Sequence, residues 1–291
     1  MPTFTTPEPI SALVQLAVGD ATITATDRDD TVVRVRPSDS ARDADVRAAD
    51  QTRVEYASGR LVVRAPRPRV LWGKVGSVDV TIELPTGSDL EADASVATVR
   101  TTGALGDCRI KTSTGDVRLD EARTTTVGTG AGTVTVEHVD GDVQISTGSG
   151  RIEVHSVAGN AVVKNSNGHN RIGTVTGSLR AKTANGDIVV SGVGHDVNAA
   201  TANGNIRIGE IARGAANLRT ARGEIEIGIR SGTAARLDVH TTFGKVQNLL
   251  AETTGPASTD DSVEIQAHTG FGDILVRRAT PDQPTGEKAE S

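Results

Sequence analysis

An 18-residue repeat runs through residues 103–230 and constrains the fold of this 291-residue chain more than any other feature. One series consists of the glycines that close a Thr-x-x-Gly or Asn-x-x-Gly turn, at Gly115, Gly132, Gly150, Gly168, Gly186, Gly204 and Gly223. A second series has an aliphatic residue every 18 positions, at Val139, Val157, Val175, Val193 and Ile211. Two independent series with one period indicate a repeat architecture.

Within one period the apolar residues alternate with polar ones, which is typical of β-strands rather than helices. Val143, Ile145 and Thr147 occupy every second position, and Ile152 and Val154 continue the pattern after a glycine-containing turn. Strands this short, each with one apolar face, need the equivalent strand of the next period as a partner, at a spacing of about 4.8 Å. The sequence therefore predicts an all-β fold, a parallel β-solenoid with about 18 residues per coil.

The composition predicts a narrow core built from small side chains. Only 2% of the residues are aromatic, and the chain contains 32 glycines. Large aromatic side chains normally supply much of the volume of a globular core. Here Val, Ile, Leu and Ala supply it, and the frequent glycines indicate turns between short strands.

Asparagine occupies two kinds of position in the repeat. Asn167-Gly168, Asn185-Gly186 and Asn203-Gly204 stand at equivalent corners, where both residue types tolerate positive φ, and turn geometry is favoured over a ligand-binding ladder. Asn170 stands at an inward position that Ile152 and Ile188 hold in the neighbouring coils. It is compatible with a hydrogen bond to coil backbone, with a local distortion, or with a polar functional pocket.

We divide the chain into a β-rich N-terminal capping module (1–95), solenoid repeats (96–279) and a polar, disordered tail (280–291). Inside the first module, residues 38–52 and 66–76 are expected to be loops, and an inserted loop is expected at residues 252–261. After Arg230 the repeat returns with longer coils, in which Phe243 and Phe271 occupy equivalent positions. We expect these two rings to plug the last coils; the alternative is an aromatic contact for a partner.

Two motifs link the chain to a known family. They are the segment VDVTIELPTGSDLEADASVATV, which leads into the repeat, and the recurrent G-[DN]-[IV]-x-[IV], as at Gly115-Asp116-Val117 and Gly186-Asp187-Ile188. With these motifs the chain to about residue 278 resembles a bacterial putative-adhesin family of β-strand-repeat proteins, a domain-of-unknown-function family common in actinobacteria. The resemblance implies a cell-surface adhesin and implies no particular site residues.

Charge and composition argue against several functions. The net charge of −6 disfavours nucleic acid as a partner. No apolar run approaches the roughly 20 residues of a membrane span, and no secretory signal is visible. Cys108 is the one cysteine, which suits a reducing compartment, so we expect a cytoplasmic location.

No residue is assigned a catalytic, cofactor-binding or metal-binding role. The six histidines, among them His138, His155 and His240, lack zinc-binding spacing and are expected at outward or turn positions. Repeated aspartates follow glycine at Asp116, Asp142, Asp187 and Asp273. The nonapeptide of calcium-binding β-rolls is absent from the sequence, so these carboxylates are expected to cap turns.

The sequence favours a non-enzymatic scaffold, a rigid solenoid that docks a protein partner or a second copy of itself. The alternative is an adhesin-like carbohydrate-binding module, for which a glycan would be the partner. A polysaccharide-acting β-helix enzyme is the remote alternative, because such sites need clustered carboxylates and aromatic platforms that this chain does not display.

Overall fold

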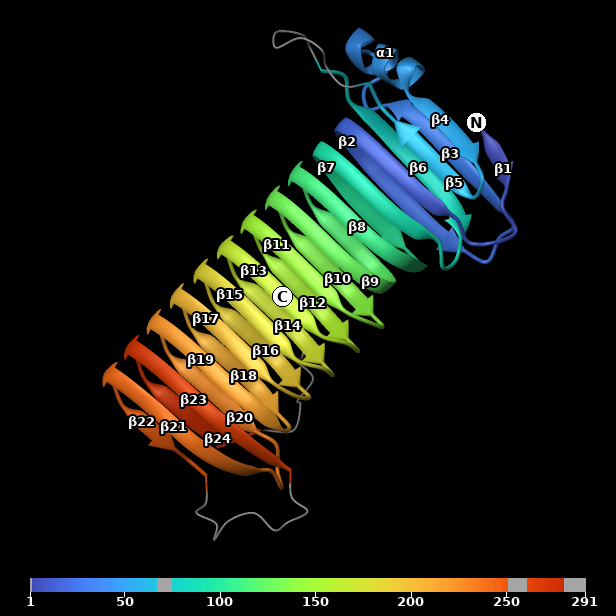
Figure 1. Ribbon diagram of the computed structural model, residues 1–291. Coiled ribbons are helices and arrows are strands. Elements are labelled where there is room, and N and C mark those ends of the chain that lie inside the picture. The colour runs from blue at the N-terminus through green and yellow to red at the C-terminus, as the bar shows by residue number, and fades with distance from the viewer. Residues whose placement is uncertain (1, 67–74, 251–260, 280–291) are drawn as a thin grey trace, which may run out of the picture.

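The protein is a β-solenoid, as its repeat predicts, and Figure 1 shows its coils stacked along one axis. The computed structural model describes residues 2–66, 75–250 and 261–279. Most coils consist of two strands that lie in two opposite walls, here called wall A and wall B. The predicted tail at 280–291, the inserted loop apart from residue 261, and residues 67–74 of the second predicted loop lie outside the described residues.

Wall A contains, in spatial order towards the C-terminal end, β8 (Ala104–Thr114), β11 (Val143–Ser149), β13 (Ala161–Asn167), β15 (Leu179–Asn185), β17 (Val197–Asn203), β19 (Gly214–Arg222), β23 (Ser262–Phe271) and β21 (Ala234–Phe243). Wall B contains β10 (Val134–Val139), β12 (Ile152–Val157), β14 (Asn170–Val175), β16 (Ile188–Val193), β18 (Ile206–Ile211), β20 (Ile225–Ile229), β24 (Ile274–Arg278) and β22 (Val246–Asn248). Three longer strands contribute to both walls: β2 (Ser11–Thr26), β7 (Asp89–Thr102) and β9 (Val117–Ala131).

Strands in each wall pair parallel and in register with the equivalent strand one period away. Ile152 is the Cα partner of Val134 on one side and of Asn170 on the other, a shift of 18 residues each time. The inward side chains of both walls form one continuous core, in which Ile145, Ile152 and Ile188 are fully buried. The core is therefore narrow and aliphatic, as the composition predicts.

The repeated glycine is required because the coils approach each other closely at that corner. Gly168, Gly186 and Gly204 have φ of 140°, 131° and 150°, a region that favours glycine. A Cβ atom added to Gly186 would lie 2.1 Å from the carbonyl oxygen of Gly168 in the preceding coil. The corner must therefore be glycine in coil after coil, which explains the period of the first sequence series.

The threonine that precedes each turn has a buried hydroxyl that satisfies backbone at the same corner. Thr201 Oγ1 donates to the carbonyl oxygen of Gly186 at 3.1 Å, and Thr220 Oγ1 donates to that of Gly204 at 2.9 Å. Thr269 makes the same contact with Gly223 at 2.9 Å. Thr147 and Thr183 instead donate to the carbonyl oxygen two residues on, in their own coil. The turn threonines therefore satisfy corner carbonyl groups, and at some corners they link consecutive coils.

Antiparallel strands close the N-terminal end of the stack. The elements there are β1 (Thr3–Thr5), β3 (Asp30–Pro37), β4 (Arg53–Ala57), β5 (Arg60–Arg64) and β6 (Val78–Pro85). Strands β5 and β6 stack parallel on β2, whereas β4 pairs antiparallel with β5 and β3 pairs antiparallel with β6. This change of direction ends the parallel stack, as the cap of a solenoid must.

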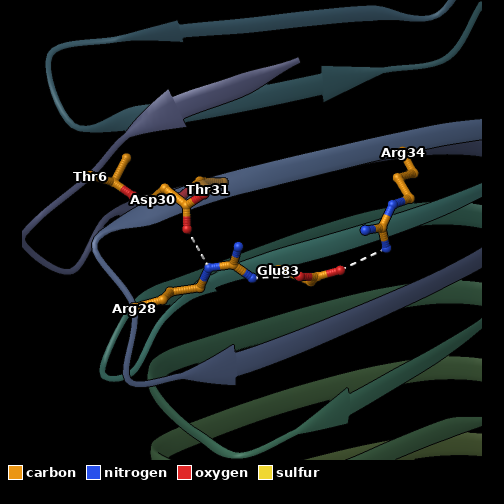
Figure 2. A network of polar contacts seen from close by, with 6 residues as sticks. All are labelled: Thr6, Arg28, Asp30, Thr31, Arg34 and Glu83. Atoms are coloured by element: carbon orange, nitrogen blue, oxygen red, sulfur yellow. Dashed lines mark hydrogen bonds and ion pairs between the residues drawn. The ribbon is translucent and has the colours of Figure 1, made fainter. Parts of the chain in front are cut away.

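Ion pairs connect the capping strands, as Figure 2 shows. The Arg28 guanidinium donates to Glu83 at 2.6 Å and to Asp30 at 2.8 Å, and Arg34 donates to the second oxygen of Glu83 at 2.7 Å. The hydrogen bond from Arg28 lowers the pKa of the Glu83 carboxyl, with further help from the charge of Arg34. The network holds β3 against β6.

The expectation of a loop at residues 38–52 is wrong in part, because α1 (Asp43–Gln51) forms there and lies at the N-terminal end (Figure 1). Ala48 of this helix packs into the core cluster. Asp45 is fully buried, and its carboxylate accepts the backbone N–H of Ser77 at 3.1 Å. Contacts with residues far away in sequence therefore stabilise the helix.

The two coils at the C-terminal end are stacked out of sequence order. After β20 the chain forms β21 and β22, and β23 and β24 follow in sequence. In space, however, β23 pairs with both β19 and β21, and β24 pairs with both β20 and β22. The later coil thus lies between the body of the stack and the earlier one, which makes β21 and β22 the terminal coil.

Candidate interaction surface

Wall A carries a group of exposed cations on strands that contain no carboxylate. Strands β11, β13, β15, β17 and β19 contain no aspartate or glutamate. Their outward side chains include five basic residues, all exposed, which we call the cationic wall: Lys164, Arg180, Lys182, Arg219 and Arg222. This segregation is unusual in a chain whose net charge is −6.

The register places these cations close together. Lys164 and Lys182 are Cα partners on adjacent strands, so their side chains leave the same face one coil apart. Within the described residues, none of the five cations forms an ion pair. Like charges directly opposite each other in a sheet are destabilising. The wall therefore carries an uncompensated positive field, which an anionic partner would neutralise.

Beside the cations, a ladder of side-chain amides follows the corner of the coils. Asn185 Nδ2 donates to Asn167 Oδ1 at 2.8 Å, and Asn203 Nδ2 donates to Asn185 Oδ1 at 2.8 Å. All three residues are exposed. The positive φ of the glycine that follows each asparagine confirms that these are turns. The ladder presents amide groups to solvent in line with Arg222, the next residue in the same column.

The column continues into the two phenylalanines, and the expectation that they plug the core is wrong. Phe243 and Phe271 are 62% and 54% exposed, and their rings stack with centroids 4.8 Å apart at 10°. They occupy the outward corner that Asn203 and Arg222 hold in the preceding coils. The sequence correctly predicts that the two positions are equivalent. In the inward–outward alternation of the strand, however, both positions face solvent.

On wall B, by contrast, several charged side chains are paired. Arg207 donates to Glu226 at 2.6 Å, Arg277 donates to the same carboxylate at 2.9 Å, and Arg230 contacts Glu210 at 2.6 Å. Burial raises the pKa of Glu226, but its bonds with the two arginines outweigh this effect and the pKa is lowered. This carboxylate is therefore held ionised.

An open cavity of about 840 Å³ lies over wall B. Its lining includes Thr174, Ser191, His195, Glu210 and Arg213. Arg213 Nη2 lies 3.1 Å from His195 Nε2. A glycosidase needs a protonated carboxyl and a second carboxylate on the two sides of the scissile bond. Glu210, one of the two carboxylates in the lining with Asp261, is paired with Arg230 at 2.6 Å.

Asn170 is buried and pairs with another side chain rather than with coil backbone. Asn165 Nδ2 donates to Asn170 Oδ1 at 3.0 Å and to the carbonyl oxygen of Gly150 at 2.9 Å. Asn165 Oδ1 and Asn170 Nδ2 have no hydrogen-bond partner. The two residues stand where most other coils have threonine and isoleucine, and each gives the other a hydrogen-bond partner in the core.

Cys108 lies in the core, and we predict that it is inert towards thiol reagents in the folded protein. Burial, with smaller contributions from the carboxylates of Asp89 and Asp107, raises the pKa of its thiol to about 12. At pH 8 the reactive thiolate is then on the order of 1,000-fold scarcer than for an unperturbed thiol. A disulfide reagent should label the chain only after denaturation. Rapid labelling of native protein would contradict this.

The aspartates that follow glycine lie at turns, but each accepts a hydrogen bond from the backbone of an adjacent coil and not from its own turn. Asp116 Oδ1 accepts the backbone N–H of Thr133, and Asp187 Oδ1 accepts that of Asn205, each at 2.8 Å. Asp142 and Asp273 accept backbone N–H groups of the adjacent coil in the same way. Within the described ranges, no cluster of three or more His, Cys, Asp or Glu residues has the geometry for a metal ion.

The histidines lie on the surface, also as predicted: His138, His155 and His240 are exposed. His240 stacks on His268, with ring centroids 5.4 Å apart, in the column that contains Arg219. Sequence reasoning missed the cationic wall, although a signal was present. Sorting the charged residues by wall, instead of summing them over the chain, separates the cations from the carboxylates.

In the part of the chain that the structure describes, no helix has the length and apolarity needed to cross a membrane.

Comparisons with known proteins give one family match. The model of the family described as Toastrack DUF4097 matches residues 14–277. No curated protein matches the chain.

Several solved structures align with the chain over nearly its whole length. A putative adhesin from Bacteroides fragilis NCTC 9343 is 11% identical, with 94% of this chain and 95% of that chain covered and a TM-score of 0.33. A putative adhesin from Parabacteroides merdae ATCC 43184 is 12% identical, with 96% and 95% covered and a TM-score of 0.30. A putative cell adhesion protein from Clostridium sporogenes ATCC 15579 is 11% identical, with 95% and 98% covered and a TM-score of 0.20.

Proposed function

Because the chain belongs to the Toastrack DUF4097 family, we propose that it is a non-enzymatic β-solenoid scaffold whose cationic wall docks an acidic segment of a protein partner. Membership in the family confirms the resemblance inferred from the repeat motifs. The observation that carries the proposal is the set of five exposed cations on strands that contain no carboxylate. Complementary charge across an interface favours encounter and orientation.

The shape of the wall supports a protein partner. Lys164 and Lys182 project from the adjacent strands β13 and β15, at the strand spacing of about 4.8 Å, and the β19 cations lie two strands beyond β15 in the same rigid wall. Side-chain amides of Asn167, Asn185 and Asn203 lie beside them and offer both donors and acceptors. An acidic segment laid along the wall would gain ion pairs and relieve the repulsion between Lys164 and Lys182.

The proposal predicts that Lys164→Glu/Lys182→Glu weakens binding of a fluorescent poly-glutamate peptide at least about tenfold. Reversal of two adjacent cations turns attraction into repulsion at the centre of the wall. Fluorescence anisotropy at low ionic strength measures the dissociation constant, and added salt should weaken binding to the native wall. Circular dichroism checks that the variant stays folded.

The matched control is Arg118→Glu/Arg171→Glu, which makes the same change in net charge on exposed residues of the opposite wall. Its affinity for poly-glutamate should stay within about twofold of the native value. Equal losses from both double variants would show that only the total charge matters, and the proposed site would then be wrong.

An adhesin-like carbohydrate-binding module is the second candidate, favoured by one observation. The exposed Phe243–Phe271 stack continues the column of the amide ladder, which combines an apolar ring with hydrogen-bonding groups. A glycan array probed with folded protein tests this function. A signal that Phe243→Ala abolishes would support it, and a blank array would contradict it.

The proposal assigns no catalysis to the chain, because the wall B carboxylates Glu210 and Glu226 are paired with arginines. A polysaccharide-acting enzyme needs a carboxyl that can donate a proton, whereas the pKa of Glu226 is lowered. A cytoplasmic location stays a prediction, and fractionation of the native host tests it against the cell surface.

A further inference from the structure

We propose that two copies of this chain join end to end, through antiparallel pairing of their β21 strands. This inference concerns the open C-terminal end of the solenoid and not the cationic wall. It adds to the proposed docking scaffold a second copy of the chain as one partner. The cationic wall and the open end are separate surfaces, so an experiment can disprove one without affecting the other.

The terminal coil has an open strand edge. Among the described residues, β21 pairs with β23 alone and β22 pairs with β24 alone. Ala234 N–H donates to Asp261 O on the β23 side at 2.8 Å. Since successive residues of a strand direct their backbone groups to opposite sides, those of Ala235, Leu237 and Val239 point along the solenoid axis, away from the stack. Another strand is the protein partner that matches such a row.

The apolar surface of the molecule is concentrated at the same end. Four of the six large apolar side chains that are exposed in the described residues belong to the last two coils: Phe243, Val246, Leu249 and Phe271. The inward residues Leu237 and Val239 are only half buried, whereas their counterparts one coil earlier, Ile265 and Ala267, are buried. The core is therefore partly exposed at the C-terminal end of the stack. At the N-terminal end the antiparallel strands cover it.

The sequence of β21 is complementary to itself in an antiparallel orientation. If the pairing is centred on Leu237, then Arg236 lies opposite Asp238 of the second copy, and the twofold axis creates this pair twice. Opposite charges across a strand pair stabilise the pairing. A register centred on Asp238 would instead set two carboxylates against each other. Both Arg236 and Asp238 are exposed, and neither forms an ion pair within the described residues.

The twofold axis that relates two antiparallel strands is perpendicular to their sheet, so it keeps the inward face of each copy inward. Leu237 and Val239 of the two copies would then lie on the same inward face of one joined sheet. The open end thus becomes the middle of a longer rod that is capped at both outer ends.

Sedimentation velocity of the full chain tests the proposal. The native protein should form a species of twice the 30.1 kDa chain mass as its concentration rises. Arg236→Asp and Asp238→Arg should each weaken self-association at least about tenfold, because each sets like charges opposite each other. An equimolar mixture of these two variants should form a heterodimer, since the charges across it are again opposite. The double variant should recover the native dimer.

The matched control is Arg180→Asp, which reverses an exposed charge in the column of Asp238 but in the middle of wall A. It should leave the dimer unchanged. A native chain that stays monomeric would overturn the proposal, and cross-links between Lys245 and Lys288 in that monomer would assign the open end to the chain's own tail. A dimer insensitive to both charge reversals would also overturn it. In either case, loss of poly-glutamate binding by the cationic-wall variant would leave the proposed function standing.

Discussion

Replacing Gly186 with alanine is expected to destabilise the protein by about 4 kcal/mol, the sum of backbone strain and an overpacked corner. Gly186 has φ of 131°, which side chains with a Cβ rarely adopt, and the new atom would lie 2.1 Å from Gly168 O. That oxygen belongs to the backbone of the adjacent coil, so it cannot move away without breaking the stack. A large fall in the urea midpoint measures the effect.

The neighbouring Gly192 offers a matched control in the same coil. It has an ordinary φ, and a Cβ added there would meet no atom within 4 Å. Gly192→Ala should therefore change the free energy of unfolding by no more than about 0.5 kcal/mol. If the two alanine variants unfolded at similar urea concentrations, the close approach of the coils at the glycine corner would be disproved.

The double variant Asn165→Thr/Asn170→Ile should stabilise the protein by about 2–3 kcal/mol. It restores the threonine and isoleucine that most other coils have at these positions, and it removes two buried polar atoms that lack partners. An unpaired buried donor or acceptor costs about 1–3 kcal/mol, and replacement of a buried polar pair by apolar groups is often stabilising. Thermal and urea unfolding of the double variant measure the gain.

The single variants distinguish this explanation from simple hydrophobicity. Asn170→Ile alone leaves Asn165 bonded only to Gly150 O, so part of the gain should be lost. Asn165→Thr alone leaves Asn170 buried without any partner and should be destabilising. Additive effects of the two changes would show that the amides do not act as a pair, contrary to the geometry.

The coil repeat could be predicted because every coil repeats the same local requirements. A glycine at positive φ, a threonine or asparagine at the corner before it and alternating inward residues all recur with the period of the coil. Each leaves a mark in the sequence that does not depend on contacts elsewhere. Gly186 and Thr201 illustrate this, since their roles follow from spacing alone.

The rest depended on contacts between residues distant in sequence. The helix α1 is stabilised by a hydrogen bond from the backbone N–H of Ser77 to Asp45, and no repeat in the sequence predicts this contact. The repeat predicts that Phe243 and Phe271 are equivalent, which the paired strands β21 and β23 confirm, but their large rings favour burial, and the structure has them at an exposed corner. The cationic wall was hidden because the net charge of −6 averages over both walls.

Because the last two coils are stacked out of sequence order, β21 and β23 compete for the same edge of β19 while the chain folds. During synthesis β21 emerges before β23, and the edge of β19 that β23 finally occupies is free when β21 appears. Stacking in sequence order would close a shorter loop and so cost less chain entropy. The native arrangement therefore requires that β23 takes the edge of β19 and that β21 is left outermost. A ribosome-bound chain that ends before Ser262 lacks the strand that settles this competition.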